Sequence, residues 1–150
     1  MARELLARTE PMVRGLPIEH ARVRLTLARI GNERTATRTL EAELDDLVQE
    51  ARALNVAPLL EEALHVRARA RLAAGQSELA IEDYRGALDQ AERTRGMLQA
   101  DRFRVAFAGD RHALYEECIG AVLDESSGAN LSEAFSLVER GKSRALLDLL

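Results

Sequence analysis

The segment from Gly75 to Ala91 constrains the fold more than any other part of the chain. Gly75 precedes Ser77, a residue type that caps helices. Small and large side chains then recur every three or four positions, which places them on one helical face. These residues are Ala80, Tyr84, Ala87, Leu88 and Ala91. The alanines allow a second helix to approach closely while the tyrosine ring wedges beside it, so the segment predicts a tightly packed helix.

A second amphipathic helix is expected over residues 59–74, and Gly75 ends it. The resulting helix–turn–helix hairpin resembles a tetratricopeptide (TPR) repeat. The matching residues are Ala68, Gly75, Ala80, Ile81, Tyr84, Ala87 and Leu88. Of these, all except Ile81 and Leu88 are the predicted repeat-packing positions. Arg67 and Arg71 differ from the family, which usually has apolar residues at these two places.

The composition favours helices throughout the 150 residues. Only three residues are proline, and alanine, leucine, arginine and glutamate dominate. No segment shows a sustained alternation of apolar and polar residues, so no strand is expected. With 47% hydrophobic and 31% charged residues, the chain has a soluble globular composition and the length of one domain. The predicted fold class is therefore all-α.

Turn signals divide the chain into about three helical hairpins, at residues 17–55, 58–98 and 101–150. The first two hairpins have about 40 residues and the third has 50, longer than a standard TPR of roughly 34, so the helices are extended by about a turn or so each. The expected architecture is a right-handed antiparallel solenoid of these hairpins. Residues 1–16 are expected to form a short helix or a disordered segment, and residues 17–150 a TPR-like repeat domain.

Each further helix carries an apolar stripe. The stripe of the helix that begins at Pro17 is Ile18, Ala21, Leu25 and Ala28. The stripe of the helix expected over 33–55, the most regular in the chain, is Leu40, Leu44, Leu47, Val48, Ala51 and Leu54. The stripe expected after residue 100 is Phe103, Phe107, Leu114, Cys118, Ile119 and Val122. The stripe of the last helix is Ala134, Phe135, Val138, Ala145, Leu146 and Leu149.

Leucines surround the end of the last helix, which predicts that it is covered by another structure. The residues of this candidate interface are Leu146, Leu147, Leu149 and Leu150. The cover is expected to be a further domain of a longer protein or, alternatively, a second subunit. Residues 133–150, preceded by Phe103, Phe107, Asp110, Tyr115 and Ile119, look like the last repeat of TPR–CHAT proteins. In that bacterial family the segment leads into a caspase-like peptidase domain, whose catalytic residues would follow residue 150.

Several chemical functions lack support in the sequence. The net charge is −4, which gives no electrostatic reason to expect nucleic acid as a partner. There is no secretory signal, no apolar run long enough for a membrane span, and only one cysteine, so no intrachain disulfide forms. We therefore expect a cytoplasmic protein without a membrane partner.

Individual motifs also favour structural roles. The Gly141–Ser143 segment lacks the first glycine of a phosphate-binding loop, because Ser136 occupies that position. No metal is expected, because the three histidines lack metal-type spacing. They are His20, His65 and His112. Cys118 is expected to be a buried, inert thiol. The charged residues of its helix are expected to be solvated. They are Asp110, Arg111, Glu116 and Glu117.

The sequence favours a protein-interaction scaffold without enzymatic activity and without a cofactor. The TPR resemblance implies that the first helix of the central hairpin lines a concave groove. Its partner-binding residues would be Glu62, His65 and Arg69, of which Arg69 suits a partner carboxylate. The TPR–CHAT resemblance implies docking on, and regulation of, a caspase-like peptidase domain. The alternatives are a homodimerisation module joined through the C-terminal leucines, or a small enzyme that uses Cys118.

Overall fold

The computed structural model describes the whole chain except residues 1, 33–37, 98–100, 126–129 and 149–150. All regular elements of the described residues are helices and none is a strand, which confirms the all-α fold class. The elements are α1 (Ala2–Thr9), the 3-10 helix η1 (Glu10–Val13), α2 (Pro17–Asn32), α3 (Arg38–Leu54), α4 (Ala57–Ala73), α5 (Ser77–Met97), α6 (Asp101–Asp124) and α7 (Asn130–Asp148).

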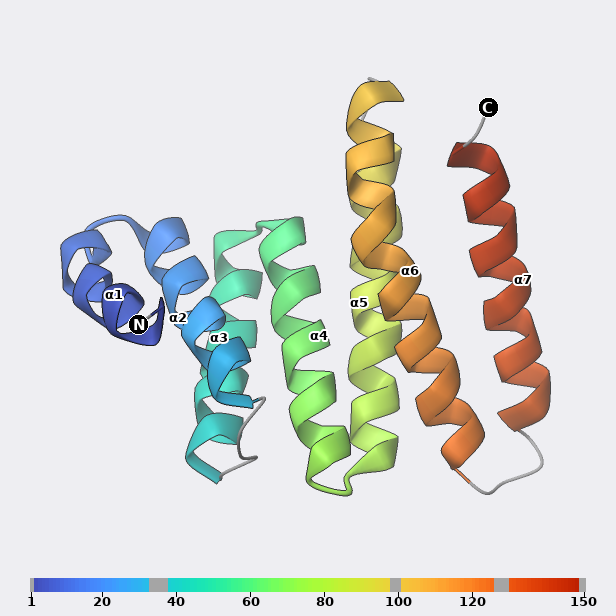
Figure 1. The fold of residues 1–150 in the computed structure, drawn as a ribbon, viewed down its shortest axis with the longest axis horizontal. Coiled ribbons are helices and arrows are strands. Elements are labelled where there is room, and N and C mark those ends of the chain that lie inside the picture. Colours follow the sequence, from blue (N-terminus) through green and yellow to red (C-terminus); the bar gives the residue numbers. More distant parts are fainter. Residues whose placement is uncertain (1, 33–37, 98–100, 126–129, 149–150) are drawn as a thin grey trace.

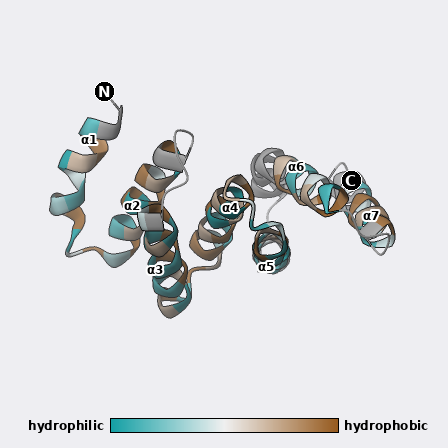
Figure 2. Cartoon of the chain, turned by 90° about the horizontal axis from the view of Figure 1, so that it is seen from below, coloured by the Kyte–Doolittle hydropathy of each residue, from teal (hydrophilic) through white to brown (hydrophobic). Residues whose placement is uncertain are grey.

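Helices α2 to α7 stand side by side in chain order, and each runs antiparallel to the one before it (Figure 1). Each consecutive pair packs together, and α2 also packs against α4. Figure 2 shows that α3 and α5 lie on the same side of α4, so α4 faces the space between α3 and α5. At the N-terminal end, α1 and η1 pack on α2. Every helix of the row therefore has neighbours close in sequence.

The turn between α4 and α5 has the geometry that its glycine predicts. Gly75 has a φ of +78°, a conformation that disfavours a residue with a Cβ atom. The backbone N–H of Gln76 donates to the carbonyl of Arg71 at 2.9 Å, and that of Gly75 to the carbonyl of Leu72 at 3.0 Å. This pair of bonds is a Schellman motif, which satisfies the last carbonyls of the helix. The glycine thus ends α4 where α5 must reverse direction.

The predicted apolar faces form one core. The packing face of α5 is buried throughout, with Ala80, Tyr84 and Ala87 at most 1% exposed, and Ala68 of α4 is fully buried against it. The stripes of α2 and α3 are buried as predicted, except that Ile18 and Leu54 are only partly covered. In α6, Leu114, Cys118 and Val122 are buried, whereas the side chains of Phe103 and Phe107 lie outside the described residues.

The predicted stripe of α7 was wrong at one position. Phe135 is 67% exposed, and Leu137, which the stripe omitted, is 4% exposed. The face that packs against α6 runs through Ala134, Leu137 and Gly141. A Cβ atom added at Gly141 would lie 3.6 Å from the Tyr115 ring. Since Phe135 follows Ala134 by one residue, it is turned about 100° away from that face. The side chains of residues 144–150, including the four C-terminal leucines, lie outside the described residues.

The conformation of Gly75 leads to a prediction. Gly75→Ala should lower the free energy of unfolding by about 1 kcal/mol, because a Cβ atom is strained at a positive φ. Gly120→Ala is the matched control, since Gly120 is exposed in α6 and no neighbour lies within 4 Å of its Cβ position. That change should raise stability by about 0.5–1 kcal/mol through helix propensity. Urea unfolding of both variants, followed by circular dichroism, measures the difference. Equal effects of the same sign would contradict the assignment.

Candidate functional site

A buried arginine of α4 joins three helices. The Arg67 Nε atom donates to Oδ2 of Asp83 on α5 at 2.8 Å, and its Nη2 donates to Oδ1 of the same carboxylate at 2.6 Å. Its Nη1 atom donates to Oδ1 of Asp45 on α3 at 2.7 Å. The side chains of Arg67 and Asp83 are 9% and 5% exposed. A bidentate pair with additional hydrogen bonds is the arrangement in which buried charges are best compensated.

Arg71 extends this network by one helical turn. Its Nη1 atom donates to Oδ2 of Asp83 at 2.8 Å, and its Nη2 donates to Oδ1 of Asp45 at 3.3 Å. Arg67 and Arg71 are therefore two arginines on one face of α4 that share the same two carboxylates. These are the positions at which the sequence differs from the TPR pattern. An ion network across α3, α4 and α5 thus involves the two positions at which the TPR family usually has apolar residues.

The network keeps the Arg67 guanidinium charged. Burial by itself lowers the pKa of a guanidinium, because the charged form loses its hydration. The hydrogen bonds and negative charge of Asp83, followed by those of Asp45, outweigh this effect and raise the pKa of Arg67 above its ordinary value. The Arg67 guanidinium is therefore charged, and the carboxylates of Asp83 and Asp45 balance it.

A second polar cluster lies between α4, α5 and α6. Oε2 of Glu117 lies 2.9 Å from the His65 Nε2 atom and accepts a hydrogen bond from the Tyr84 hydroxyl at 3.1 Å. The Arg69 Nε atom is 3.6 Å from the same oxygen. Burial, followed by the charge and hydrogen bond of Glu117, raises the pKa of Tyr84, so its hydroxyl remains a donor. The carboxylate of α6 thereby connects the central hairpin to the next one.

This cluster accounts for two of the three predicted partner-binding residues. His65 and Arg69 both face Glu117 of α6, and Glu62 lies 3.6 Å from Arg29 of α2. All three thus have partners within the chain, and their role toward another protein stays a prediction. The expectation that Glu117 is solvated was wrong, because it accepts two hydrogen bonds while Glu116 pairs with His112 at the surface. Nothing in the local sequence distinguishes Glu117 from Glu116; only its neighbours in space do.

Two ion pairs attach α7 to α5. Arg85 binds Glu133 through two bonds of 2.6 Å, and the Nη2 atom of Arg140 donates to Glu92 at 2.9 Å. The Tyr115 hydroxyl of α6 donates to the same Glu92 oxygen at 3.1 Å. The two pairs have opposite polarity. In the first pair α5 supplies the arginine and α7 the glutamate, and in the second α5 supplies the glutamate and α7 the arginine.

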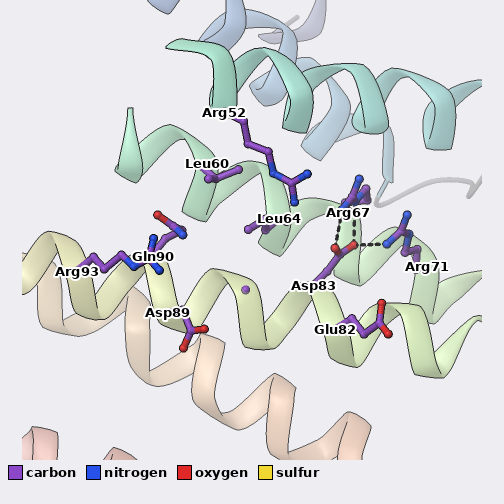
Figure 3. A pocket seen from close by; sticks show the side chains of 11 residues that line it. Arg52, Leu60, Leu64, Arg67, Arg71, Glu82, Asp83, Asp89, Gln90 and Arg93 are labelled. Atoms are coloured by element: carbon purple, nitrogen blue, oxygen red, sulfur yellow. Dashed lines mark hydrogen bonds and ion pairs between the residues drawn. The ribbon is translucent and has the colours of Figure 1, made fainter. Parts of the chain in front are cut away.

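A cleft of about 340 Å³ opens beside the buried network. It is lined by residues of α3, α4 and α5 (Figure 3). Leu60 and Leu64 of α4 form its apolar part, Arg52 of α3 and Arg93 of α5 contribute cations, and Arg67, Arg71 and Asp83 lie at one end. No local sequence pattern predicts this cleft, because its lining comes from three helices. It is the candidate site that this part of the structure offers to a partner.

The remaining reactive group lies in the core. Cys118 is 0% exposed, and burial raises the pKa of its thiol from 9.0 to about 11. A neutral, enclosed thiol is a poor nucleophile. Among the described residues, no group of three or more acidic, histidine or cysteine side chains is arranged to hold a metal ion. Gly141–Ser143 lies within α7, so it is helical as the sequence predicted.

Comparisons of the chain with known protein families, curated proteins and solved structures find no match. The described helices include none that is long and apolar enough to cross a membrane. Inferences about function therefore depend on the geometry of the helices, the polar clusters and the cleft.

Loss of a buried ion pair is expected to lower the free energy of unfolding more than loss of a similar ion pair at the surface. Arg67→Met should lower the free energy of unfolding by about 3 kcal/mol, because Asp83 then loses its bidentate partner in the interior. Arg85→Met is the matched control, since Arg85 also binds a carboxylate through two bonds but is 48% exposed; it should cost less than about 1 kcal/mol. Urea unfolding measures both.

Asp83→Asn combined with Arg67→Met should recover part of the loss, because the double variant removes both buried charges of the pair. Equal losses of unfolding free energy in Arg67→Met and Arg85→Met would show that burial does not make the Arg67–Asp83 pair costlier to break.

The thiol of Cys118 predicts a pH dependence of stability. Below pH 9 the thiol is neutral in both the folded and unfolded chain. Between pH 9 and about 11 the thiol ionises in the unfolded chain but not in the folded one, which lowers the free energy of the unfolded state, so stability falls. The loss should reach about 2 kcal/mol at the upper end of this range. Cys118→Ala lacks this contribution, so the difference between the two unfolding curves isolates it. Parallel declines in both proteins would refute the assignment.

Proposed function

We propose that the chain is a protein-interaction scaffold with no covalent chemistry of its own. In this proposal α2 to α7 are three hairpins of a right-handed, TPR-like solenoid, and a partner protein binds along its surface. The row of antiparallel helices supports the proposal, because stacked hairpins present long, rigid surfaces that repeat proteins use for binding. The observation that carries it is the open cleft over α4, which the rigid ion network borders at one end.

The positions of the candidate chemical groups also favour binding over catalysis. Cys118, the candidate nucleophile, is enclosed in the core. Several polar side chains between helices form ion pairs that join one hairpin to the next. Such pairs fix the geometry of a surface, which reduces the entropy lost when a partner binds. They supply no arrangement of nucleophile and base.

The resemblance of residues 133–150 to TPR–CHAT proteins suggests a class of partner. A caspase-like peptidase domain would dock on the helices, which would sense a signal and pass it to the peptidase. The setting would be the cytoplasm of a bacterium. This part of the proposal comes from family analogy, because function is located in sites and not in folds.

A homodimerisation module is the second candidate function. Leu131 and Phe135 are 71% and 67% exposed. They are four residues apart and therefore lie on one face of α7. This face is apolar and open, so a second copy of the chain would cover it together with the C-terminal leucines. A concentration-dependent dimer in sedimentation experiments that Phe135→Glu dissociates would favour this candidate.

The scaffold proposal is tested by capture followed by reconstitution. The immobilised chain should retain at least one protein from a lysate of its source, and excess soluble chain should displace it. The captured protein, once purified, should bind the chain in calorimetry with a dissociation constant of about micromolar order, typical of a transient interface. Turnover of peptide or ester substrates by the pure chain, abolished by Cys118→Ala, would contradict the proposal in favour of the enzyme.

A further inference from the structure

We propose that the cleft between α3 and α5 binds an acidic peptide segment. In this proposal Arg52 and Arg93 hold carboxylates of the segment, and an apolar side chain beside them rests on Leu60 and Leu64. The inference rests on the proposed function, because it names the surface of the scaffold that binds and the chemistry of its partner. The site is distinct from the predicted groove residues, which lie toward α2 and α6.

The available positive charge in the cleft belongs to Arg52 and Arg93. The other two arginines of the lining, Arg67 and Arg71, are occupied by Asp83 and Asp45. Arg52 and Arg93 are exposed, and neither takes part in the hydrogen bonds or ion pairs of the described residues. In Figure 3 the Arg52 side chain extends toward Leu64, and the Arg93 guanidinium lies beside Gln90. A guanidinium matches a carboxylate in shape and donor geometry.

The acidic residues of the lining do not neutralise these two arginines. Asp83 is shared by Arg67 and Arg71. Asp89 points away from Gln90 and Arg93 in Figure 3, and its Oδ1 atom lies 4.0 Å from Arg140 of α7. Glu82 lies at the opposite end of the lining from Arg93. The cleft is thus locally positive around its apolar part, although the chain carries a net charge of −4. This local charge complements an acidic segment.

The apolar part of the lining is small and comes mainly from Leu60. Leu60 is partly buried and keeps some apolar surface that a peptide side chain can cover, whereas Leu64 is only 4% exposed and adds little. Gly86 keeps this part of the lining open, because α5 lies so close to α4 that a Cβ at Gly86 would be 3.2 Å from the Leu64 Cδ1 atom. A volume of about 340 Å³ is at the lower end of ligand pockets. It suits a few residues of a peptide.

Fluorescence anisotropy with labelled peptides tests the proposal. The probe is a peptide of alternating glutamate and leucine, and its counterpart has lysine in place of glutamate. The glutamate peptide should bind the chain, the lysine peptide should not, and rising salt should weaken binding. Arg52→Gln and Arg93→Gln should each weaken binding about tenfold, since each removes a charge-assisted hydrogen bond. Arg22→Gln, at an exposed site on α2 outside the cleft, should leave it unchanged.

Three results would overturn the proposal. The first is a glutamate peptide that binds no more tightly than the lysine peptide. The second is equal binding by the Arg52→Gln, Arg93→Gln and Arg22→Gln variants. The third is an oligonucleotide of equal charge that binds as well as the peptide, which would show a site for any polyanion. Because both arginines are exposed, the variants should keep the circular dichroism spectrum of the parent chain.

The captured protein separates this inference from the proposed function. If that protein binds the Arg52→Gln/Arg93→Gln variant as tightly as the parent chain, the cleft is not its site and the inference fails, while the scaffold proposal stands. If no protein is captured but the acidic peptide binds and both arginines are required, the scaffold proposal fails and the cleft remains a peptide site.

Discussion

The arrangement of α3, α4 and α5 depends on one guanidinium group. Arg67 lies inside the protein with its charge shared between Asp83 and Asp45, beside the apolar core that the same three helices form. Ion pairs of this kind add little net stability compared with apolar residues of the same volume, but they tolerate few alternative geometries. Their contribution is therefore the fixed relation of three helices. The cleft inherits this rigidity, because the network forms one of its ends.

The elements that the sequence predicted well are those with local signals. Gly75 marks a helix end and Pro17 a helix start, and the spacing of Ala80, Tyr84 and Ala87 indicates the buried face directly. Phe135 was misplaced because apolar residues occur around much of α7. A pattern that covers a helix on several sides does not state which side packs, and only the contact with Tyr115 of α6 decides it.

The candidate site was not predictable in the same way. Arg67 meets residues 16 and 22 positions away, and His65 meets Glu117 at a separation of 52. Whether a charged residue of a helix is solvated or engaged depends on the neighbouring helix, which local periodicity does not describe. The two arginines at 67 and 71 were noticed as departures from the repeat pattern. No sequence pattern distinguished their acidic partners, Asp83 and Asp45, and none predicted the cleft between the helices.

The exchanged charges between α5 and α7 carry a consequence for assembly. Arg85 and Glu92 are seven residues apart on α5, and Glu133 and Arg140 are seven apart on α7. If α7 slid along α5 by two turns, arginine would face arginine in one direction and glutamate would face glutamate in the other. Slippage by a heptad, which apolar ridges alone would permit, is therefore penalised either way. The two ion pairs together therefore favour one alignment of α7 along α5.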